Sequence, residues 1–377
     1  VCGISDSTLF HRLPWRAYVD RNRFGLHALY LHICMPNSNV KLIVESKVPF
    51  VRGLLDSYAT VRYLAPEEIT PKAVADADGM IIRTRTRCDE DLLGRSDVKF
   101  IATATIGTDH IDMPWCASRG ITAVNAPGCN APAVAQYVFG TLMQLSNRPL
   151  AGQTIGIVGV GHVGAIVERW ARGLDMRVLC CDPPRQRAEG GDDWVSLDRI
   201  ALEADIITFH TPLTHEGDDA TFHIVDSAFL SKLRRAPIII NSARGEIVDT
   251  AALIAAKDAG LTGPLAIDCW ENEPDIDREL LRRCAVATPH IAGYSRQGKI
   301  RASQMALDAV TTFFMLPRVT VEQPLPKAPA RTVTAAGIAA SYNPVADTFA
   351  LKSEPELFET LRNGYALRDE APEGAES

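Results

Sequence analysis

Hydrophobic residues in this chain fall into short runs separated by segments with helical spacing. The runs at 40–44, 80–82 and 100–104 are apolar at nearly every position, as in "VKLIV" and "FIATA". Such runs are typical of strands that are buried on both faces of a parallel sheet. The alternation therefore predicts an α/β protein whose parallel sheet is covered by helices on both sides.

A second series of strands and helices follows a long apolar segment, "APAVAQYVFGTLMQLS" at 131–146. We expect this segment to form a helix that connects two domains. Beyond it, apolar runs open the stretches at 204–213, 236–249 and 263–274, and each run leads into a polar loop. The pattern predicts a second parallel sheet, so we expect two doubly wound domains.

The stretch "GQTIGIVGVGHVGAIVERWARGL" places a strand, a set of glycines and an amphipathic helix in direct succession. Gly159 suits the tight turn after the strand, Gly161 lets a pyrophosphate approach the backbone, and Gly164 lets helix and strand pack closely. The helix N-terminus, with His162 and Val163, adds N–H donors and positive potential. This arrangement predicts a dinucleotide-binding site.

An acidic residue at the end of the next strand bears on the choice of dinucleotide. The strand "MRVLCCD" ends in Asp182, about twenty residues after the glycines, where a carboxylate takes the ribose hydroxyls. The same carboxylate would repel a 2′-phosphate, which favours NAD over NADP. Arg185 and Arg187 lie nearby and weaken that preference.

Composition and charge narrow the function classes. The 377 residues carry a formal net charge of -7, and no basic run suggests nucleic acid or an anionic membrane as a partner. No apolar stretch is long enough to span a bilayer. The nine cysteines are scattered without metal spacing, so we expect a reduced, cytoplasmic protein with no metal site. Residues 1–34 lack clear periodicity, so the segment 1–39 is interpreted as a disordered extension or a mis-annotated start, with a functional arm as the alternative.

Hydride transfer to NAD requires a group that moves a proton and a group that grips the substrate. His290 suits the proton, because the ordinary pKa of histidine lies near neutral pH. A carboxylate such as Glu273 would orient the ring, and an arginine such as Arg244 would grip a substrate carboxylate through two hydrogen bonds. These residues and Asp268 follow predicted strand ends, where ligands bind in α/β sheets.

The motifs "SARGEIVD", "DCWENEP" and "PHIAGYS" resemble the catalytic motifs of the D-2-hydroxyacid dehydrogenases, and the resemblance extends over residues 40–315. It implies an NAD-dependent oxidoreductase acting on the CH–OH group of a 2-hydroxy acid. By this resemblance, Arg244 of this chain would bind and polarise the substrate, Glu273 would pair with the histidine, and His290 would be the acid/base.

Further stretches resemble a branch of that family with a phosphorylated 2-hydroxy acid as substrate. They are "TATIGTDHID", "APGCNAPAVAQYV", "CDPPR", "FHTPLTHEG" and "PHIAGYSRQGK". By this resemblance the substrate-binding residues are Thr84, Thr105 and Tyr294. The cofactor-contacting positions beyond the glycine loop are Asp182, Thr211, Ser242, Ala243, Arg244, Asp268 and Gly293.

The resemblance also implies a domain organisation with the active site in a cleft. The substrate-binding domain would be discontinuous, and the chain would associate as a homodimer through a short C-terminal appendage. The expected boundaries are 40–131 with 294–317 for the substrate-binding domain, 132–293 for the NAD-binding domain, and 318–377 for the linker and dimerisation segment. Within that segment, Ser353 and Glu356 predict a capping box for a short helix with Leu357, Phe358 and Leu361 on its apolar face.

Several other residues allow more than one interpretation. His110 is expected to be structural, and Cys129 has no neighbouring base that would make it a nucleophile. In "RTRTRC", an extended conformation would place Arg83, Arg85 and Arg87 on one face. That segment is either a solvated strand end or a part of the substrate site that helps to neutralise a phosphate.

Two alternative functions remain open at this point. The first is another enzyme of the same family, acting on 3-phosphoglycerate or on glyoxylate and hydroxypyruvate. It would keep the same catalytic residues, and only Thr84, Thr105 and Tyr294 argue against it. The second is an NAD-sensing protein resembling the family's transcriptional corepressors, which need not use the catalytic residues.

Overall fold

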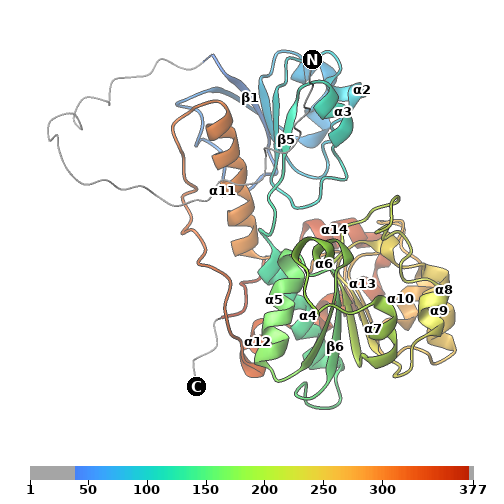
Figure 1. The fold of residues 1–377 in the computed structure, drawn as a ribbon. Coiled ribbons are helices and arrows are strands. Elements are labelled where there is room, and N and C mark those ends of the chain that lie inside the picture. Colours follow the sequence, from blue (N-terminus) through green and yellow to red (C-terminus); the bar gives the residue numbers. More distant parts are fainter. Residues whose placement is uncertain (1–38, 373–377) are drawn as a thin grey trace, which may run out of the picture. The chain divides into compact units, whose positions relative to one another are not determined.

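The structure, a computed structural model, describes residues 39–372. It contains two parallel β-sheets, each covered by helices (Figure 1). The prediction of two doubly wound α/β domains is confirmed. The proposed N-terminal extension lies outside the described residues, apart from Asn39.

The first sheet has the strand order β2-β1-β3-β4-β5, and all its neighbouring strands are parallel. Side chains alternate between its two faces, because successive residues of a strand point to opposite sides. Leu42 and Val44 belong to one core cluster, whereas Ile43 between them belongs to the other. The strands are β1 (Lys41–Glu45), β2 (Thr60–Leu64), β3 (Gly79–Ile82), β4 (Phe100–Thr103) and β5 (Thr122–Val124).

Helices from distant parts of the chain cover this sheet. One face packs against short helices of the same segment, α1 (Pro71–Val74), α2 (Glu90–Leu93) and α3 (Met113–Ser118), and η1 (Pro66–Glu68) precedes them. The other face packs against α11 (Arg296–Phe313), which buries Ile300, Leu307 and Val310 there. Figure 1 shows α11 in orange alongside the blue strands. The chain thus returns to the first sheet after it has built the second.

The second sheet has the strand order β11-β10-β9-β8-β6-β7 and is also fully parallel. Trp194 makes a single parallel bridge to Cys180 beside β7, at the position of the third strand in a dinucleotide-binding fold. The strand order reverses between β6 and β8, where ligands bind in such sheets. The strands are β6 (Thr154–Val158), β7 (Arg177–Cys181), β8 (Ile206–Phe209), β9 (Ile238–Asn241), β10 (Leu265–Ile267) and β11 (Val286–Ala287).

Two helical layers cover this second sheet. One layer comprises α4 (Ala131–Leu145), α5 (His162–Gly173) and α12 (Ala335–Ser341). The opposite layer includes α7 (Leu197–Glu203), α8 (Ser227–Ser231), α9 (Thr250–Asp258) and α10 (Arg278–Arg283). Two short helices, α6 (Pro183–Glu189) and η2 (Gly245–Ile247), follow strand ends. The predicted connecting helix is α4, which follows the last strand of the first sheet and precedes the first strand of the second.

The C-terminal segment packs against its own chain. It forms α12, α13 (Val345–Ser353), η3 (Pro355–Leu357) and α14 (Phe358–Asn363). Leu351 and Phe358 are fully buried in the core of the second sheet, and Leu361 packs beside them. The predicted capping box is wrong, because Ser353 ends α13 instead of starting a helix. Leu357 is 37 % exposed, so it does not belong to the apolar face.

Two expectations drawn from composition can be compared with the described residues. No helix between residues 39 and 372 combines the length and apolar character needed to cross a bilayer. All cysteines in that range are buried and free of disulfides.

Candidate active site

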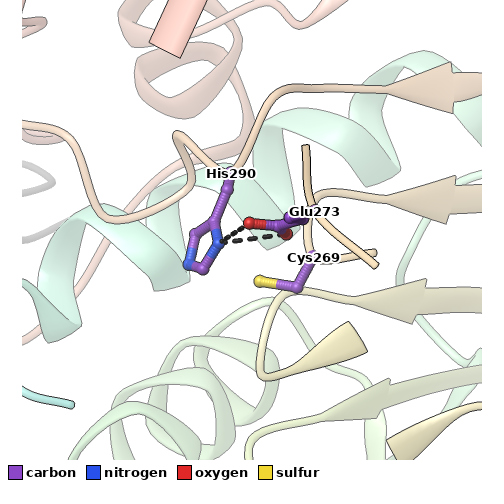
Figure 2. A group of neighbouring side chains, drawn as sticks. All are labelled: Cys269, Glu273 and His290. Carbon is purple, nitrogen blue, oxygen red and sulfur yellow. Dashed lines mark hydrogen bonds and ion pairs between the residues drawn. The ribbon is translucent and has the colours of Figure 1, made fainter. Parts of the chain in front are cut away.

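His290 and Glu273 face each other beyond the ends of β11 and β10. Nδ1 of His290 lies 2.9 Å from Oε2 and 3.1 Å from Oε1 of the Glu273 carboxylate (Figure 2). Both side chains are largely buried, with the histidine 28 % exposed and the glutamate 17 %. The structure therefore brings the predicted pair together, and it leaves Nε2 as the ring nitrogen not engaged by Glu273.

The loop that carries His290 is held by a buried carboxylate. The Asp268 carboxylate accepts hydrogen bonds from the Ile291 N–H (2.8 Å), the Ala292 N–H (2.9 Å) and the Thr288 hydroxyl (2.7 Å). Burial raises the pKa of Asp268. His290 has φ +56°, a left-handed conformation that costs a non-glycine residue free energy. These bonds offset that cost, so Asp268 orients the catalytic loop.

Several groups hold Glu273 in its charged form. Burial alone would raise its pKa, but the positive charge and hydrogen bond of His290 oppose that, as does the Trp270 N–H at 2.9 Å. The guanidinium of Arg362, on α14, lies 3.6 Å from the carboxylate and adds to the effect. The net result is a lowered pKa. A charged Glu273 can stabilise a protonated histidine.

Cys269 lies next to this pair in Figure 2 and was not predicted from the sequence. Among residues 39–372, Cys269, Glu273 and His290 form the one group whose potential metal-ligand atoms all lie within 4.8 Å of one another. Burial raises the pKa of the Cys269 thiol well above its ordinary value, which keeps it neutral. A neutral thiol is a poor nucleophile.

Arg244 extends from the loop after β9 towards the first sheet. Its guanidinium lies 3.2 Å from Oδ2 of Asp109, and a Cβ on Gly107 would be only 2.4 Å from it. Asn241 fixes the loop by donating to the Arg244 carbonyl (2.8 Å). Gly245 is needed because a Cβ there would lie 2.0 Å from the Trp270 backbone. Asn241 and Gly245 are positioning residues that the sequence analysis did not single out.

The glycine loop has the geometry expected of a pyrophosphate cradle. A Cβ on Gly164 would lie 2.2 Å from the Gly159 carbonyl oxygen, so that glycine permits the helix to pack on the strand. A Cβ on Gly161 would meet no protein atom within 4 Å. The open space at Gly161 leaves the backbone there accessible to a ligand. His162 is exposed and Val163 half-buried beside it.

Asp182 and its neighbouring arginines are arranged for a cofactor without a 2′-phosphate. The Asp182 carboxylate accepts from the Val160 N–H (2.8 Å) of the glycine loop and from the Arg185 N–H (3.0 Å). Arg185 pairs with Glu189, and Arg187 pairs with an aspartate. Because acidic side chains engage both arginines, they are less available to bind the 2′-phosphate of NADP. The preference for NAD is therefore stronger than the sequence alone indicated.

Two predicted cofactor-contacting residues have unsatisfied side chains. The hydroxyls of Thr211 and Ser242 are buried and have no hydrogen-bond partner, and the same holds for Nδ1 of His210. Buried polar atoms without a partner cost free energy unless a ligand satisfies them. Ala243 is buried in the same loop as Ser242, and a Cβ on Gly293 would lie 2.1 Å from Asn130 Nδ2. The unpartnered hydroxyls of Thr211 and Ser242 fit a polar cofactor beyond the strand ends.

The predicted substrate-binding residues lie in three different loops. Thr84 is exposed in the turn after β3. The hydroxyl of Thr105 lies 2.6 Å from that of Thr103 and donates to the Gly107 carbonyl, in the loop that meets Arg244. The ring of Tyr294 faces the ammonium of Lys299, which is 4.1 Å from its centroid.

The segment "RTRTRC" is a turn and not an extended strand, so its arginines diverge. Arg83 donates to the Lys47 carbonyl (3.0 Å), Arg85 pairs with Glu359, and Arg87 pairs with Asp89. The condition under which they would share one face is therefore not met, because a turn does not keep the alternation of a strand.

Two other sequence interpretations concern His110 and Cys129. Nε2 of His110 lies 3.1 Å from the Thr103 hydroxyl, and burial lowers the pKa of this histidine. Burial also raises the pKa of Cys129 to about 11. A neutral His110 and a neutral Cys129 fit structural roles.

The C-terminal tail fastens the catalytic loop. Arg368 donates to the backbone carbonyls of Ile291 (3.1 Å) and Ala292. Its backbone carbonyl accepts from the Arg296 N–H (2.9 Å), at the start of α11. The tail therefore contributes to the site through Arg362 and Arg368, which the sequence analysis did not predict.

Comparison with known proteins agrees with this geometry. Residues 134–292 match the family described as D-isomer specific 2-hydroxyacid dehydrogenase, NAD binding domain. The chain is 46% identical over 338 residues to erythronate-4-phosphate dehydrogenase of Bacteroides thetaiotaomicron, covering 88% of this chain and 97% of the relative. It is 41% identical over 295 residues to the enzyme of that name from Klebsiella pneumoniae, covering 77% and 78%.

A solved structure shares the fold. The D-lactate dehydrogenase of Aquifex aeolicus, complexed with NAD and lactic acid, superposes with a TM-score of 0.63 and 25% sequence identity. The match covers 73% of this chain and 95% of that structure. The similarity extends across most of both proteins.

Proposed function

The chain belongs to the erythronate-4-phosphate dehydrogenases, within the family of D-isomer specific 2-hydroxyacid dehydrogenases, and from this premise we propose its reaction. It oxidises 4-phospho-D-erythronate at C2 to (R)-3-hydroxy-2-oxo-4-phosphooxybutanoate, a step of pyridoxal phosphate (vitamin B6) biosynthesis. The observation that carries the proposal is the hydrogen bond between His290 and Glu273 beyond the strand ends of an NAD-binding domain.

NAD would be held at the reversal of strand order in the second sheet. The pyrophosphate would approach Gly161 and the N-terminus of α5, and Asp182 would accept from the ribose hydroxyls. The unpartnered hydroxyls of Thr211 and Ser242 would find partners on the cofactor. When bound, NAD supplies the acceptor for the hydride that leaves C2 of the substrate.

His290 moves the proton in this proposal. Nε2 accepts the proton of the C2 hydroxyl while the C2–H bonding pair leaves as hydride, so the carbinol carbon becomes a carbonyl. Glu273 holds Nδ1 and stabilises the resulting imidazolium. In the reverse direction the same nitrogen returns the proton to the carbonyl oxygen. Asp268 acts on this step through the loop that it orients.

Arg244 binds the substrate carboxylate and polarises the developing carbonyl. Its two terminal nitrogens are directed at the Ala243 carbonyl (2.8 Å) and at Asp109 (3.2 Å). The Asp109 side chain is 65 % exposed, so a substrate carboxylate can compete for the guanidinium. Thr84, Thr105 and Tyr294 would contact the rest of the substrate.

The proposal is tested by NADH formation with the purified protein. The substrates are 4-phospho-D-erythronate, 3-phosphoglycerate and D-lactate, each with a reagent that traps 2-oxo acids because the oxidation is unfavourable. We expect a clear preference for 4-phospho-D-erythronate. A preference for 3-phosphoglycerate would support the proposed reaction type but contradict the proposed substrate. Tight NAD binding without turnover of any of them would favour the NAD-sensing alternative.

We further propose that the chain acts as a cytoplasmic homodimer without nucleic acid or membrane as a partner. Val345 and Phe349, one turn apart on α13, are 56% and 73% exposed and offer an apolar surface to a second copy. The domain boundaries proposed from the sequence are retained. Light scattering of the purified chain tests the dimer, and a monomer at micromolar concentration would contradict it.

A further inference from the structure

Two cationic side chains from separate parts of the chain contact Tyr294, next to the catalytic pair. The Lys299 ammonium, on α11, lies 4.1 Å from the centroid of the Tyr294 ring. Arg362, on α14, interacts with the Tyr294 side chain and lies 3.6 Å from Glu273. The positive charges of Arg83 and Arg362 both act on Lys299. We call Arg83, Lys299 and Arg362 the cation cluster.

The cation cluster is short of negative charge. In the described part of the chain, Lys299 is in no ion pair, and Arg83 donates its guanidinium to the Lys47 carbonyl. Arg362 shares both of its acids with other cations, because Glu273 also holds His290 and Glu359 also pairs with Arg85. Burial, followed by the charges of the two arginines, lowers the pKa of Lys299 to about 7.

Like charges that converge in a partly buried site raise its free energy, and a bound anion removes that cost. A dianionic phosphate offers several acceptor oxygens to such cations. Arg244 pairs with Asp109, whereas Lys299 and Arg362 both contact Tyr294. A substrate with a carboxylate at one end and a phosphate at the other would therefore meet different cations at its two ends.

We propose that Arg83, Lys299 and Arg362 form the binding site for the phosphate group of a phosphorylated 2-hydroxy acid. The proposal rests on the proposed function and deepens it, because it assigns the residues that select a phosphorylated substrate. Arg362 reaches the site through the C-terminal tail. Phe358, at the start of the same helix, is fully buried in the core of the second sheet and fixes α14 there.

Paired substrates provide the test. Purified full-length protein is assayed with 4-phospho-D-erythronate and with D-erythronate, which differ only in the phosphate. In Arg362→Met kcat/KM should fall for both substrates, and further for the phosphorylated one, because Arg362 also acts on Glu273. In Lys299→Met we expect kcat/KM for the phosphorylated substrate to fall about 10- to 100-fold. The value for D-erythronate should change less than about threefold. Arg83→Met should act in the same direction.

Arg87→Met is the matched control. It removes the same charge from the same turn as Arg83, but Arg87 is 84% exposed and pairs with Asp89. Both kcat/KM values should remain at the wild-type level. Inorganic phosphate provides a direct probe, because it should inhibit D-erythronate oxidation in the wild type and inhibit Lys299→Met at least about tenfold more weakly.

Each outcome separates the two proposals. A wild-type enzyme that does not prefer 4-phospho-D-erythronate to D-erythronate would contradict the proposed function. A wild-type enzyme with that preference, but with cluster variants that lose the same factor on both substrates, would overturn the phosphate site alone. Compared with Arg362→Met, Arg362→Lys should recover part of the preference for the phosphorylated substrate, because it restores the positive charge. If the planar guanidinium had a purely structural role, kcat/KM for both substrates would stay low in Arg362→Lys.

Discussion

The catalytic pair and the cation cluster adjoin each other, with Arg362 3.6 Å from Glu273, yet they are assembled differently. Glu273 and His290 follow adjacent strands of one sheet, and backbone hydrogen bonds of that sheet set their separation. Arg83, Lys299 and Arg362 come from the first sheet, the returning helix and the C-terminal tail. The groups proposed for proton transfer therefore come from neighbouring strands of one sheet. The groups proposed to select the substrate come from segments far apart in the chain.

The largest expected effect comes from removing the proton-transfer group. In His290→Gln, kcat should fall about 10²- to 10⁴-fold on phosphorylated and unphosphorylated substrates alike, because the base acts on C2 in both. NADH formation under saturating substrate measures the loss, and fluorescence titration should show unchanged NAD affinity. A variant that retains more than about a tenth of the wild-type kcat would remove His290 from this role.

A smaller effect is expected where the cofactor approaches the glycine loop. Gly161→Ala adds a methyl group that meets no protein atom within 4 Å, so the fold should be unaffected. The Kd for NAD should rise about 10- to 100-fold, because the pyrophosphate loses its close approach. Calorimetric titration measures it.

Gly173→Ala is the control for that change, since its Cβ also meets nothing within 4 Å and Gly173 ends the same helix. It should leave NAD binding unchanged and raise the free energy of unfolding by up to about 0.5–1 kcal/mol. Equal NAD affinities for the two variants would contradict the cradle.

The tail should affect catalysis through the loop that it fastens. Arg368→Met removes the hydrogen bonds to the Ile291 and Ala292 carbonyls. We expect a loss of about 2–3 kcal/mol in the free energy of unfolding and a fall in kcat of about tenfold. Arg296→Met removes an exposed ion pair at 3.4 Å and should cost less than about 1 kcal/mol. Denaturant titration and kinetic assays of the two variants measure these effects. Equal losses of stability and of kcat in Arg368→Met and Arg296→Met would contradict the role of Arg368 in holding the catalytic loop.

The smallest effect is a pH dependence of substrate selection. Since the pKa of Lys299 is lowered to about 7, the free enzyme loses this charge as pH rises through neutrality. The groups facing it are Arg83, Arg362, Cys129 and the Tyr294 ring. The KM for 4-phospho-D-erythronate should rise a few-fold between about pH 7 and pH 8.5, and the KM for D-erythronate should not. In Lys299→Arg the rise should disappear, because arginine stays protonated.

The catalytic region could be predicted from the sequence because its information is contiguous. The strand at 154–158 agrees with β6, and the predicted pair His290 and Glu273 meets at 2.9 Å. Asp268 is placed beyond its strand as expected, and the structure adds that its carboxylate holds the loop backbone. Such features follow from strand ends, turn glycines and the chemistry of the residue types.

The substrate side could not be predicted to the same depth. Only an extended conformation would place Arg83, Arg85 and Arg87 on one face, and the turn after β3 instead directs them to different partners. β2, β5 and β11 escaped notice because they are short or lie at sheet edges with mixed burial. No local pattern indicates that Arg362 reaches Glu273, since tertiary packing alone brings the tail there.

The separation of chemistry from selection is tested most directly by one matrix of rates. Wild type, His290→Gln, Lys299→Met and the double variant are each assayed for hydride transfer from 4-phospho-D-erythronate and from D-erythronate. We predict that His290→Gln lowers both rates by the same factor, that Lys299→Met lowers kcat/KM for the phosphorylated substrate alone, and that the two effects multiply in the double variant. A His290 effect confined to one substrate, or a Lys299 effect equal on both, would contradict the account.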